Sequence, residues 1–344
     1  MKAPETLTQA IVYFSDVDRC FEYAKQLRWP DGKVACPRCD SEKNSFIKTR
    51  RIWFCYGCQK QFTLKVGTIF EDSALGLDKW MTAVWMLVNC KNGISSWELH
   101  RSLGVTQKSA WFMLQRIRLA LKDKSFVKLG GMGSEVEVDE TFVGGRAVNM
   151  HKSRKARLRS KPAQGGVSND FAYRYLGKTP VQGFLDREQR KIRATVIPNV
   201  NRESLQERIL GEVECGSHIY TDKAIAYTAL QENYLHEMVN HLETYVNGRV
   251  HTNGIENFWS LLKRSLRGTY VAVEPFHLSR YVDEQAFRYN TRRDELGNRI
   301  ADATRFTEAM SQIVGRRLTY SELTGKDESP RQQSTGTGET EAPF

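Results

Sequence analysis

The residues His251-Thr-Asn-Gly-Ile-Glu-Asn-Phe-Trp-Ser-Leu-Leu-Lys263 form the most informative pattern in this chain. Apolar side chains recur at helical spacing and predict an amphipathic helix, whose packing face comprises Ile255, Phe258, Trp259, Leu262 and Leu266. Along one edge of that face the same helix places Glu256, Ser260, Lys263 and Arg267. Taken alone, this is an ordinary amphipathic helix with charges at its rim. The rest of the sequence indicates a second role for Glu256.

Composition indicates a basic globular protein. The chain has 344 residues, which is enough for two or three domains and a sizeable core. Its formal net charge of +11 favours a polyanionic partner, with nucleic acid the first expectation. A basic protein whose charge serves only solubility is the alternative.

The sequence predicts neither secretion nor membrane insertion. Residues 1–6 lack the apolar core of a signal peptide. The most apolar stretch, Trp80–Val88, is shorter than the roughly 20 residues that span a bilayer. We therefore expect a cytoplasmic protein without membrane contact, in which Cys20, Cys90 and Cys215 are free thiols.

Two cysteine pairs predict a zinc site. Cys36-Pro-Arg-Cys39 is followed after fifteen residues by Cys55-Tyr-Gly-Cys58. Two such knuckles at this separation match tetrahedral ligation by the thiolates of Cys36, Cys39, Cys55 and Cys58, as in a zinc ribbon. Four free cysteines in a reducing cell are the alternative. Because four thiolates complete the zinc shell, the expected role of the metal is structural.

A helix-turn-helix is predicted within the helical residues 77–122. Leu99 and Leu103 fit a first helix, and Gly104 fits the turn that follows. Thr106 can cap a second helix. The side chains of that helix that we expect to face outward, toward DNA, are Gln107, Lys108 and Arg116. A helical hairpin without DNA contact is the alternative.

The pattern becomes strand-like after a glycine-rich boundary, Gly130-Gly-Met-Gly133. Residues 136–143 predict a strand that contains Glu137-Val-Asp139-Glu140. Carboxylates in such a run are costly to bury without charge compensation, so they indicate a cation site. Alternation onto a solvated face is the alternative.

Residues 146–169 contain several arginines and lysines and no acidic residue. We expect a mobile loop or extended insertion here. It is either a solvated loop or an arm that neutralises phosphates and orders on binding.

Three acidic residues stand at strand ends or at a helix edge, namely Asp139, Asp222 and Glu256. Asp222 ends a predicted strand, where open α/β sheets place ligand chemistry, although a helix N-cap is an equally good interpretation of it. This order of strands and helix is what an RNase H-like fold needs to bring three carboxylates together. Carboxylate oxygens suit Mg²⁺, and two such ions can activate a hydroxyl and stabilise the leaving oxygen when a phosphodiester is cut.

Several blocks of the chain match a known family. They are Cys36-Pro-Arg-Cys39, Val138-Asp-Glu-Thr-Phe-Val-Gly-Gly145, Tyr220-Thr-Asp222, Val250-His-Thr-Asn-Gly-Ile-Glu-Asn-Phe-Trp-Ser-Leu-Leu-Lys-Arg264 and Ala286-Phe-Arg-Tyr-Asn290. Over roughly residues 10–315 the chain resembles a bacterial insertion-sequence transposase of the DDE superfamily, from the branch with an N-terminal zinc ribbon.

The resemblance implies an active site in which Asp139, Asp222 and Glu256 are catalytic and bind Mg²⁺ or Mn²⁺, with Lys263 and Arg264 contacting DNA beside it. It implies double-stranded DNA as partner, both as terminal inverted repeats and as target, and a dimer or higher oligomer on that DNA. The expected reaction cleaves the element ends and transfers the 3′-hydroxyl to target DNA. The expected location is the nucleoid.

The predicted fold class is α/β, an RNase H-like catalytic domain preceded by a zinc ribbon and a helical region. The predicted parts are a helical segment (1–30), the zinc ribbon (31–66), a helical DNA-binding region (67–128), the catalytic domain (133–315) and a mostly disordered tail (316–344). Two other functions remain open. One is a DNA-binding regulator with an inactive C-terminal domain, and the other is a nuclease or resolvase that cleaves without strand transfer.

Overall fold

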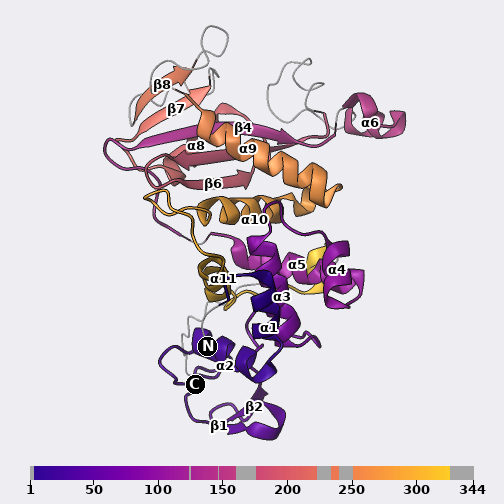
Figure 1. Ribbon diagram of the computed structural model, residues 1–344. Coiled ribbons are helices and arrows are strands. Elements are labelled where there is room, and N and C mark those ends of the chain that lie inside the picture. Colours follow the sequence, from indigo (N-terminus) through magenta and orange to yellow (C-terminus); the bar gives the residue numbers. More distant parts are fainter. Residues whose placement is uncertain are drawn as a thin grey trace, which may run out of the picture.

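A computed structural model of the chain describes residues 4–123, 125–145, 147–159, 176–222, 234–239 and 251–325 (Figure 1). A three-stranded sheet lies at one end of the molecule and a five-stranded sheet at the other, with helices between them (Figure 1). Within these ranges, no helix has both the length and the apolar character that crossing a bilayer requires.

The N-terminal part joins two helices to the cysteine-rich sheet. Asp16 caps the second helix by accepting a hydrogen bond from the Arg19 N–H. Trp53 stacks on Phe21 and Phe62, with ring centroids 5.7 and 5.6 Å away, so the sheet and the helices share one aromatic core. The elements are α1 (Leu7–Phe14), α2 (Val17–Arg28), β1 (Asn44–Ile47), η1 (Lys48–Arg50), β2 (Ile52–Cys55) and β3 (Gln61–Phe62).

The predicted helix-turn-helix is present. Gly104 closes the first helix in the left-handed conformation, with φ of +60°, which glycine adopts at little cost. Thr106 caps the second helix by accepting from the Ser109 N–H at 3.1 Å. The helices are α3 (Leu77–Asn89), α4 (Ser96–Leu103) and α5 (Gln107–Leu121). These contacts confirm the helices and the turn, while contact with DNA stays a prediction.

The expectation that Arg116 faces outward is wrong. Its side chain is 4% exposed, and it donates to the carbonyls of Leu318, at 3.0 Å, and Ile69, at 3.1 Å. The segment near the C-terminus covers this side of α5 and also brings the ring of Tyr320 to 4.6 Å from the Lys108 ammonium. Helical periodicity predicts which residues share a face, but not which distant segment covers that face.

The larger sheet has the strand order β6-β5-β4-β7-β8. β4 (Glu135–Val143) pairs antiparallel with β5 (Thr179–Asp186), which pairs antiparallel with β6 (Lys191–Val196). On its other edge β4 pairs parallel with β7 (His218–Asp222), which pairs parallel with β8 (Leu235–Val239). Three antiparallel strands extended by two parallel ones form the RNase H-like arrangement, so the predicted fold class is confirmed.

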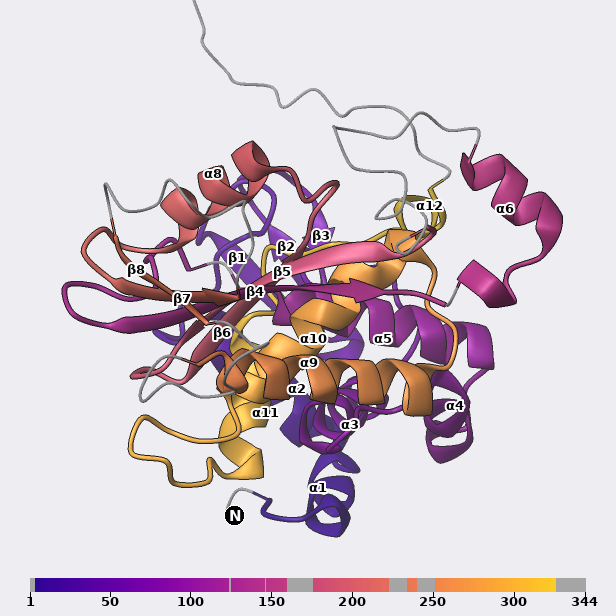
Figure 2. The same ribbon diagram turned by 90° about the horizontal axis from the view of Figure 1, so that it is seen from above.

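Helices cover both faces of this sheet (Figure 2). Val136 and Val138 of β4 pack in the same cluster as the helix α8, whereas Val181 of β5 packs with α9 and α10. Because side chains alternate along a strand, Glu137 and Asp139 point to the α9 side. The helical elements are α8 (Arg202–Glu212), α9 (Asn253–Ser265), the π-helical turn η5 (Leu266–Tyr270), η6 (Pro275–His277) and α10 (Leu278–Asn290).

The end of the chain returns to the N-terminal core. Helix α11 (Asp302–Ser311) carries Phe306, whose ring lies 5.0 Å from that of Phe14 and 5.6 Å from that of Trp85. The last described helix is α12 (Tyr320–Thr324), and residues 326–344 of the predicted disordered tail lie outside the described residues. The helical core is therefore completed by residues from both ends of the chain.

The basic segment is not a loop where it is described. The 3₁₀ turn η2 (Ala147–Asn149) and helix α6 (Lys152–Arg159) replace the predicted loop, because lysine, arginine and alanine all favour helix. Both views show α6 standing apart from the sheet (Figures 1 and 2). Residues 160–169 of this segment lie outside the described residues.

A buried ionic cluster joins α5 of the helix-turn-helix to α10, which packs on the larger sheet. Glu284 of α10 is fully buried and accepts from Arg118 of α5 at 2.6 Å, from Arg288 and from the Tyr270 hydroxyl. We expect Glu284→Gln to lower the free energy of unfolding by about 3–5 kcal/mol, because two buried guanidinium groups lose their counter-charge. Urea denaturation followed by circular dichroism measures this loss.

The matched control is Glu22→Gln. Glu22 pairs with Lys25 at 3.4 Å on the surface, and its side chain is 60% exposed. Its removal is expected to change the free energy of unfolding by less than about 1 kcal/mol. Equal losses for the two variants would contradict a stabilising role for the cluster.

Candidate active site and metal centres

Asp139 and Glu256 line the same groove. Asp139 lies in the middle of β4, and Glu256 lies in the first turn of α9, which crosses that face of the sheet (Figure 2). The open groove has a volume of about 560 Å³ and is also lined by Glu140, Thr141, Trp259, Ser260, Lys263, Arg264 and Arg267. The fold thus brings together two of the three predicted acids from elements that are distant in sequence.

The backbone of Asp222 lies beside Asp139. Thr221 of β7 pairs with Val138 of β4 in parallel register. Continuing that register by one residue places Asp222 next to Asp139, at the spacing of about 4.8 Å between neighbouring strands. The side chain of Asp222 lies outside the described residues, so its share in the site remains a prediction.

Glu137, one of the strand carboxylates that the sequence interpreted as the signal of a cation site, is buried against the start of α9. One carboxylate oxygen accepts from the Ile255 N–H at 2.8 Å, and the other accepts from Arg187 at 2.7 Å. Thr252 stands at the N-cap of α9 without a side-chain capping bond, so Glu137 caps the helix in its place. The available signal was an acid two residues before Asp139, on the same face of the strand.

Gly254 allows this close approach. A Cβ atom there would lie 2.5 Å from Cδ2 of Leu185 and 3.0 Å from Oε2 of Glu137. We expect Gly254→Ala to lower the free energy of unfolding by about 1–3 kcal/mol, because the start of α9 must move off the sheet. Urea denaturation measures the change.

Gly211 of α8 is the control for that prediction. A Cβ atom at this position has no heavy atom within 4 Å. Gly211→Ala should stabilise the protein by about 0.5–1 kcal/mol, because alanine loses less backbone entropy in a helix. If both substitutions stabilise, the packing at Gly254 is looser than described.

Basic side chains line the groove together with the acids. Lys263 and Arg264 of α9 and Arg267 of η5 line it, and both arginines are exposed. Partial burial lowers the pKa of Lys263, and the nearby Asp139 carboxylate opposes that shift. A groove that holds carboxylates beside cations fits a polyanion bound next to a metal site.

The predicted DNA-contacting residues of α5 lie outside this groove. Lys108 is exposed at the start of α5. Gln107 donates to the hydroxyl of Ser96 across the helix-turn-helix at 2.9 Å. Their contact with DNA remains a prediction.

The side chains that line the groove fit a hard cation. Among the described residues at its surface there is no cysteine or histidine, while Asp139 and Glu256 offer carboxylate oxygens. Mg²⁺ and Mn²⁺ prefer such oxygen ligands.

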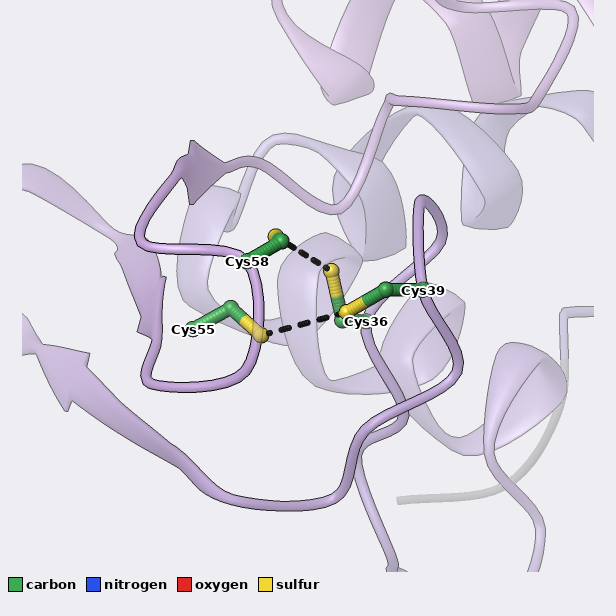
Figure 3. Close-up of side chains that lie close together, drawn as sticks. All are labelled: Cys36, Cys39, Cys55 and Cys58. Atoms are coloured by element: carbon green, nitrogen blue, oxygen red, sulfur yellow. Dashed lines mark hydrogen bonds between the residues drawn. The ribbon is translucent and has the colours of Figure 1, made fainter. Parts of the chain in front are cut away.

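The four cysteines of the ribbon fit zinc. Cys36 and Cys39 face Cys55 and Cys58, from the two predicted knuckles (Figure 3). Their sulfur atoms all lie within 4.8 Å of one another, with Cys36–Cys58 and Cys39–Cys55 pairs at 3.8 and 3.6 Å. Zinc–sulfur bonds of about 2.3 Å in a tetrahedron require sulfur pairs about 3.8 Å apart.

Comparison with known proteins finds transposase family models that match the N-terminal and the C-terminal parts of the chain. Residues 128–290 match the family model described as an ISXO2-like transposase domain, and residues 15–61 match a transposase zinc-ribbon domain. An uncharacterized protein in transposable element ISH50 of Halobacterium salinarum is 31% identical over 250 residues, which cover 70% of this chain and 80% of the relative. An uncharacterized transposase-like protein of Haemophilus influenzae is 31% identical over 101 residues, 29% of this chain and 81% of that protein.

Among solved structures, a chain of the simian T-cell lymphotropic virus intasome in complex with PP2A regulatory subunit B56 gamma is 12% identical. The match covers 58% of this chain and 66% of that chain, with a TM-score of 0.25. A TM-score this low does not establish a shared fold. The two family models and the halobacterial relative show that the chain belongs to the insertion-sequence transposases of the DDE type, with an N-terminal zinc ribbon.

Proposed function

We propose that this protein is a DNA transposase that binds the terminal inverted repeats of its insertion sequence, cleaves strands at the element ends and transfers the 3′-hydroxyl to target DNA. The observation that carries the proposal is the groove that Asp139 and Glu256 line together with Lys263, Arg264 and Arg267. Acids alone would suit many cation sites. Acids beside basic side chains suit a cation site that works on a phosphate backbone.

The acidic and the basic side chains have separate tasks in this proposal. Asp139, Asp222 and Glu256 would hold two divalent cations, which when bound activate the attacking hydroxyl and stabilise the leaving oxygen. Lys263 and Arg264 would bind phosphates on either side of the reacting bond and fix its position. No side chain in this scheme forms a covalent bond to DNA.

The N-terminal half would supply recognition. The ribbon carries exposed basic side chains that suit contacts to the DNA backbone, namely Lys43, Lys48, Arg50, Arg51 and Lys60. Lys108 and Gln107 would contribute from the start of α5. Arg116 is excluded from this surface because it is buried. A dimer or higher oligomer would bring the two element ends together.

The test uses full-length, zinc-loaded protein with labelled DNA from the ends of its own element, Mg²⁺ and a supercoiled target. Nicking at the element boundary followed by joining to the target supports the proposal. Binding without nicking would favour the regulator, and nicking without joining would favour a nuclease or resolvase. End DNA with a scrambled terminal repeat is the control for sequence recognition.

A further inference from the structure

We propose that Trp259 is a positioning residue for the metal-binding carboxylate of Asp139, and that Gly183 provides the space it needs. This inference rests on the proposed function, because it assigns Trp259 a part in the same site. The sequence predicted Trp259 only as a packing residue of the α9 stripe.

The contact is a single directed hydrogen bond. The indole N–H of Trp259 donates to Oδ2 of Asp139 at 2.9 Å, and the Trp259 side chain is 4% exposed. A carboxylate offers about four lone-pair sites, so this bond occupies one of them while it restricts rotation of the group. Trp259 therefore limits the orientations that Asp139 can adopt.

Gly183 determines where the indole lies. In the pairing of β4 with β5, Gly183 stands directly opposite Asp139. A Cβ atom on Gly183 would lie 2.8 Å from both Cη2 and Cζ2 of Trp259. The ring occupies the place of the missing side chain, and that placement aims its N–H at the neighbouring strand.

The same helix carries both Glu256 and the hydrogen-bond donor to Asp139. Ile255 binds Glu137 through its backbone N–H at 2.8 Å, one residue before Glu256, and Trp259 binds Asp139 three residues after it. Two hydrogen bonds to β4 thus lie on either side of Glu256. They fix the turn that carries Glu256 relative to the strand that carries Asp139.

Loss of such a supporting hydrogen bond typically weakens metal binding about 10- to 100-fold. Trp259→Phe removes the N–H donor and the outer part of the indole, which includes the Cζ2 and Cη2 atoms over Gly183, and keeps an aromatic ring on α9. We expect this variant to bind Mn²⁺, measured on the zinc-loaded protein by electron paramagnetic resonance, at least about tenfold more weakly. Its DNA-end binding is expected to stay near that of the unchanged protein, and its cleavage to require correspondingly more Mg²⁺.

Trp80→Phe is the matched control. Trp80 is also buried and donates its indole N–H to the Ser73 hydroxyl at 3.0 Å, but in the helical core. The Trp80→Phe variant should have a lower free energy of unfolding and an unchanged affinity for Mn²⁺. The inference would be overturned if Trp259→Phe binds Mn²⁺ with an affinity within twofold of the unchanged protein and requires the same Mg²⁺ concentration within twofold.

Gly183→Ala provides a second variant if Trp259→Phe does not fold. It keeps the N–H but displaces the ring, so weaker Mn²⁺ binding is expected again, and unchanged binding would count against the inference. Asp139→Asn separates the two proposals. If it does not weaken Mn²⁺ binding, the metal site itself is wrong; if it does and Trp259→Phe does not, only the role of Trp259 is wrong.

Discussion

Asp139→Asn is expected to abolish cleavage and joining of element-end DNA while binding of that DNA persists. The substitution removes the charge of one predicted metal ligand, and loss of several kcal/mol of transition-state stabilisation corresponds to a fall in rate of about 10³-fold or more. The fold should survive, since an asparagine oxygen can still accept the hydrogen bond that Trp259 donates at 2.9 Å. Single-turnover cleavage and a gel-shift assay on the same DNA measure the two effects separately.

Glu203→Gln is the control for this variant. Glu203 is exposed on α8, on the opposite face of the sheet from the groove. The Glu203→Gln variant should cleave and join element-end DNA at the rate of the unchanged protein. Asp139→Asn with more than about a tenth of the original rate would mean that the groove is not the reaction centre.

Removal of zinc is expected to unfold the ribbon and to abolish recognition of the element ends. Cys36 and Cys55 are fully buried, and Trp53 next to them stacks between Phe21 and Phe62. A structural zinc contributes on the order of 10 kcal/mol to the folding of its module, so no other contact there replaces it. Cys36→Ser, or chelation of the metal, should therefore reduce zinc content, lower the melting temperature and weaken end binding together.

Cys215→Ser is the matched control, because Cys215 is an exposed free thiol outside the cluster. It should retain zinc, melting temperature and DNA binding. A Cys36→Ser protein that binds element ends normally would show that the ribbon has no part in recognition. That outcome would leave the proposed catalytic groove untouched.

Local sequence was sufficient where a pattern within a few residues carries the information. Two cysteine pairs predicted the ribbon, because zinc needs four thiolates at a short, regular spacing. Gly104 and Thr106 predicted the turn between α4 and α5, because a left-handed residue and an N-cap have strong residue preferences. The strand and helix that carry Asp139 and Glu256 were also correct, since their hydrophobic periods of two and 3.6 differ clearly.

Contacts between distant segments decided the burial and orientation of charged side chains. Arg116 has the spacing of an outward residue, but Leu318 and Ile69 supply carbonyls that bury it. Glu137 is one of several alternating acids in the sequence, and only the tertiary structure shows that it accepts a hydrogen bond from the N-terminus of α9. Part of the basic segment after Gly145 is helical. The sequence did not indicate a helix there, because the segment lacks an amphipathic period.

Asp139 shows the division most clearly. Its residue type, its strand and its neighbour Glu256 could be predicted from the sequence, because metal ligands have characteristic residue types and strands have a local hydrophobic period. Its hydrogen bond to Trp259, seated over Gly183, required the tertiary structure. That contact joins a strand, its neighbour and a later helix, and no periodicity along one segment specifies how three segments meet.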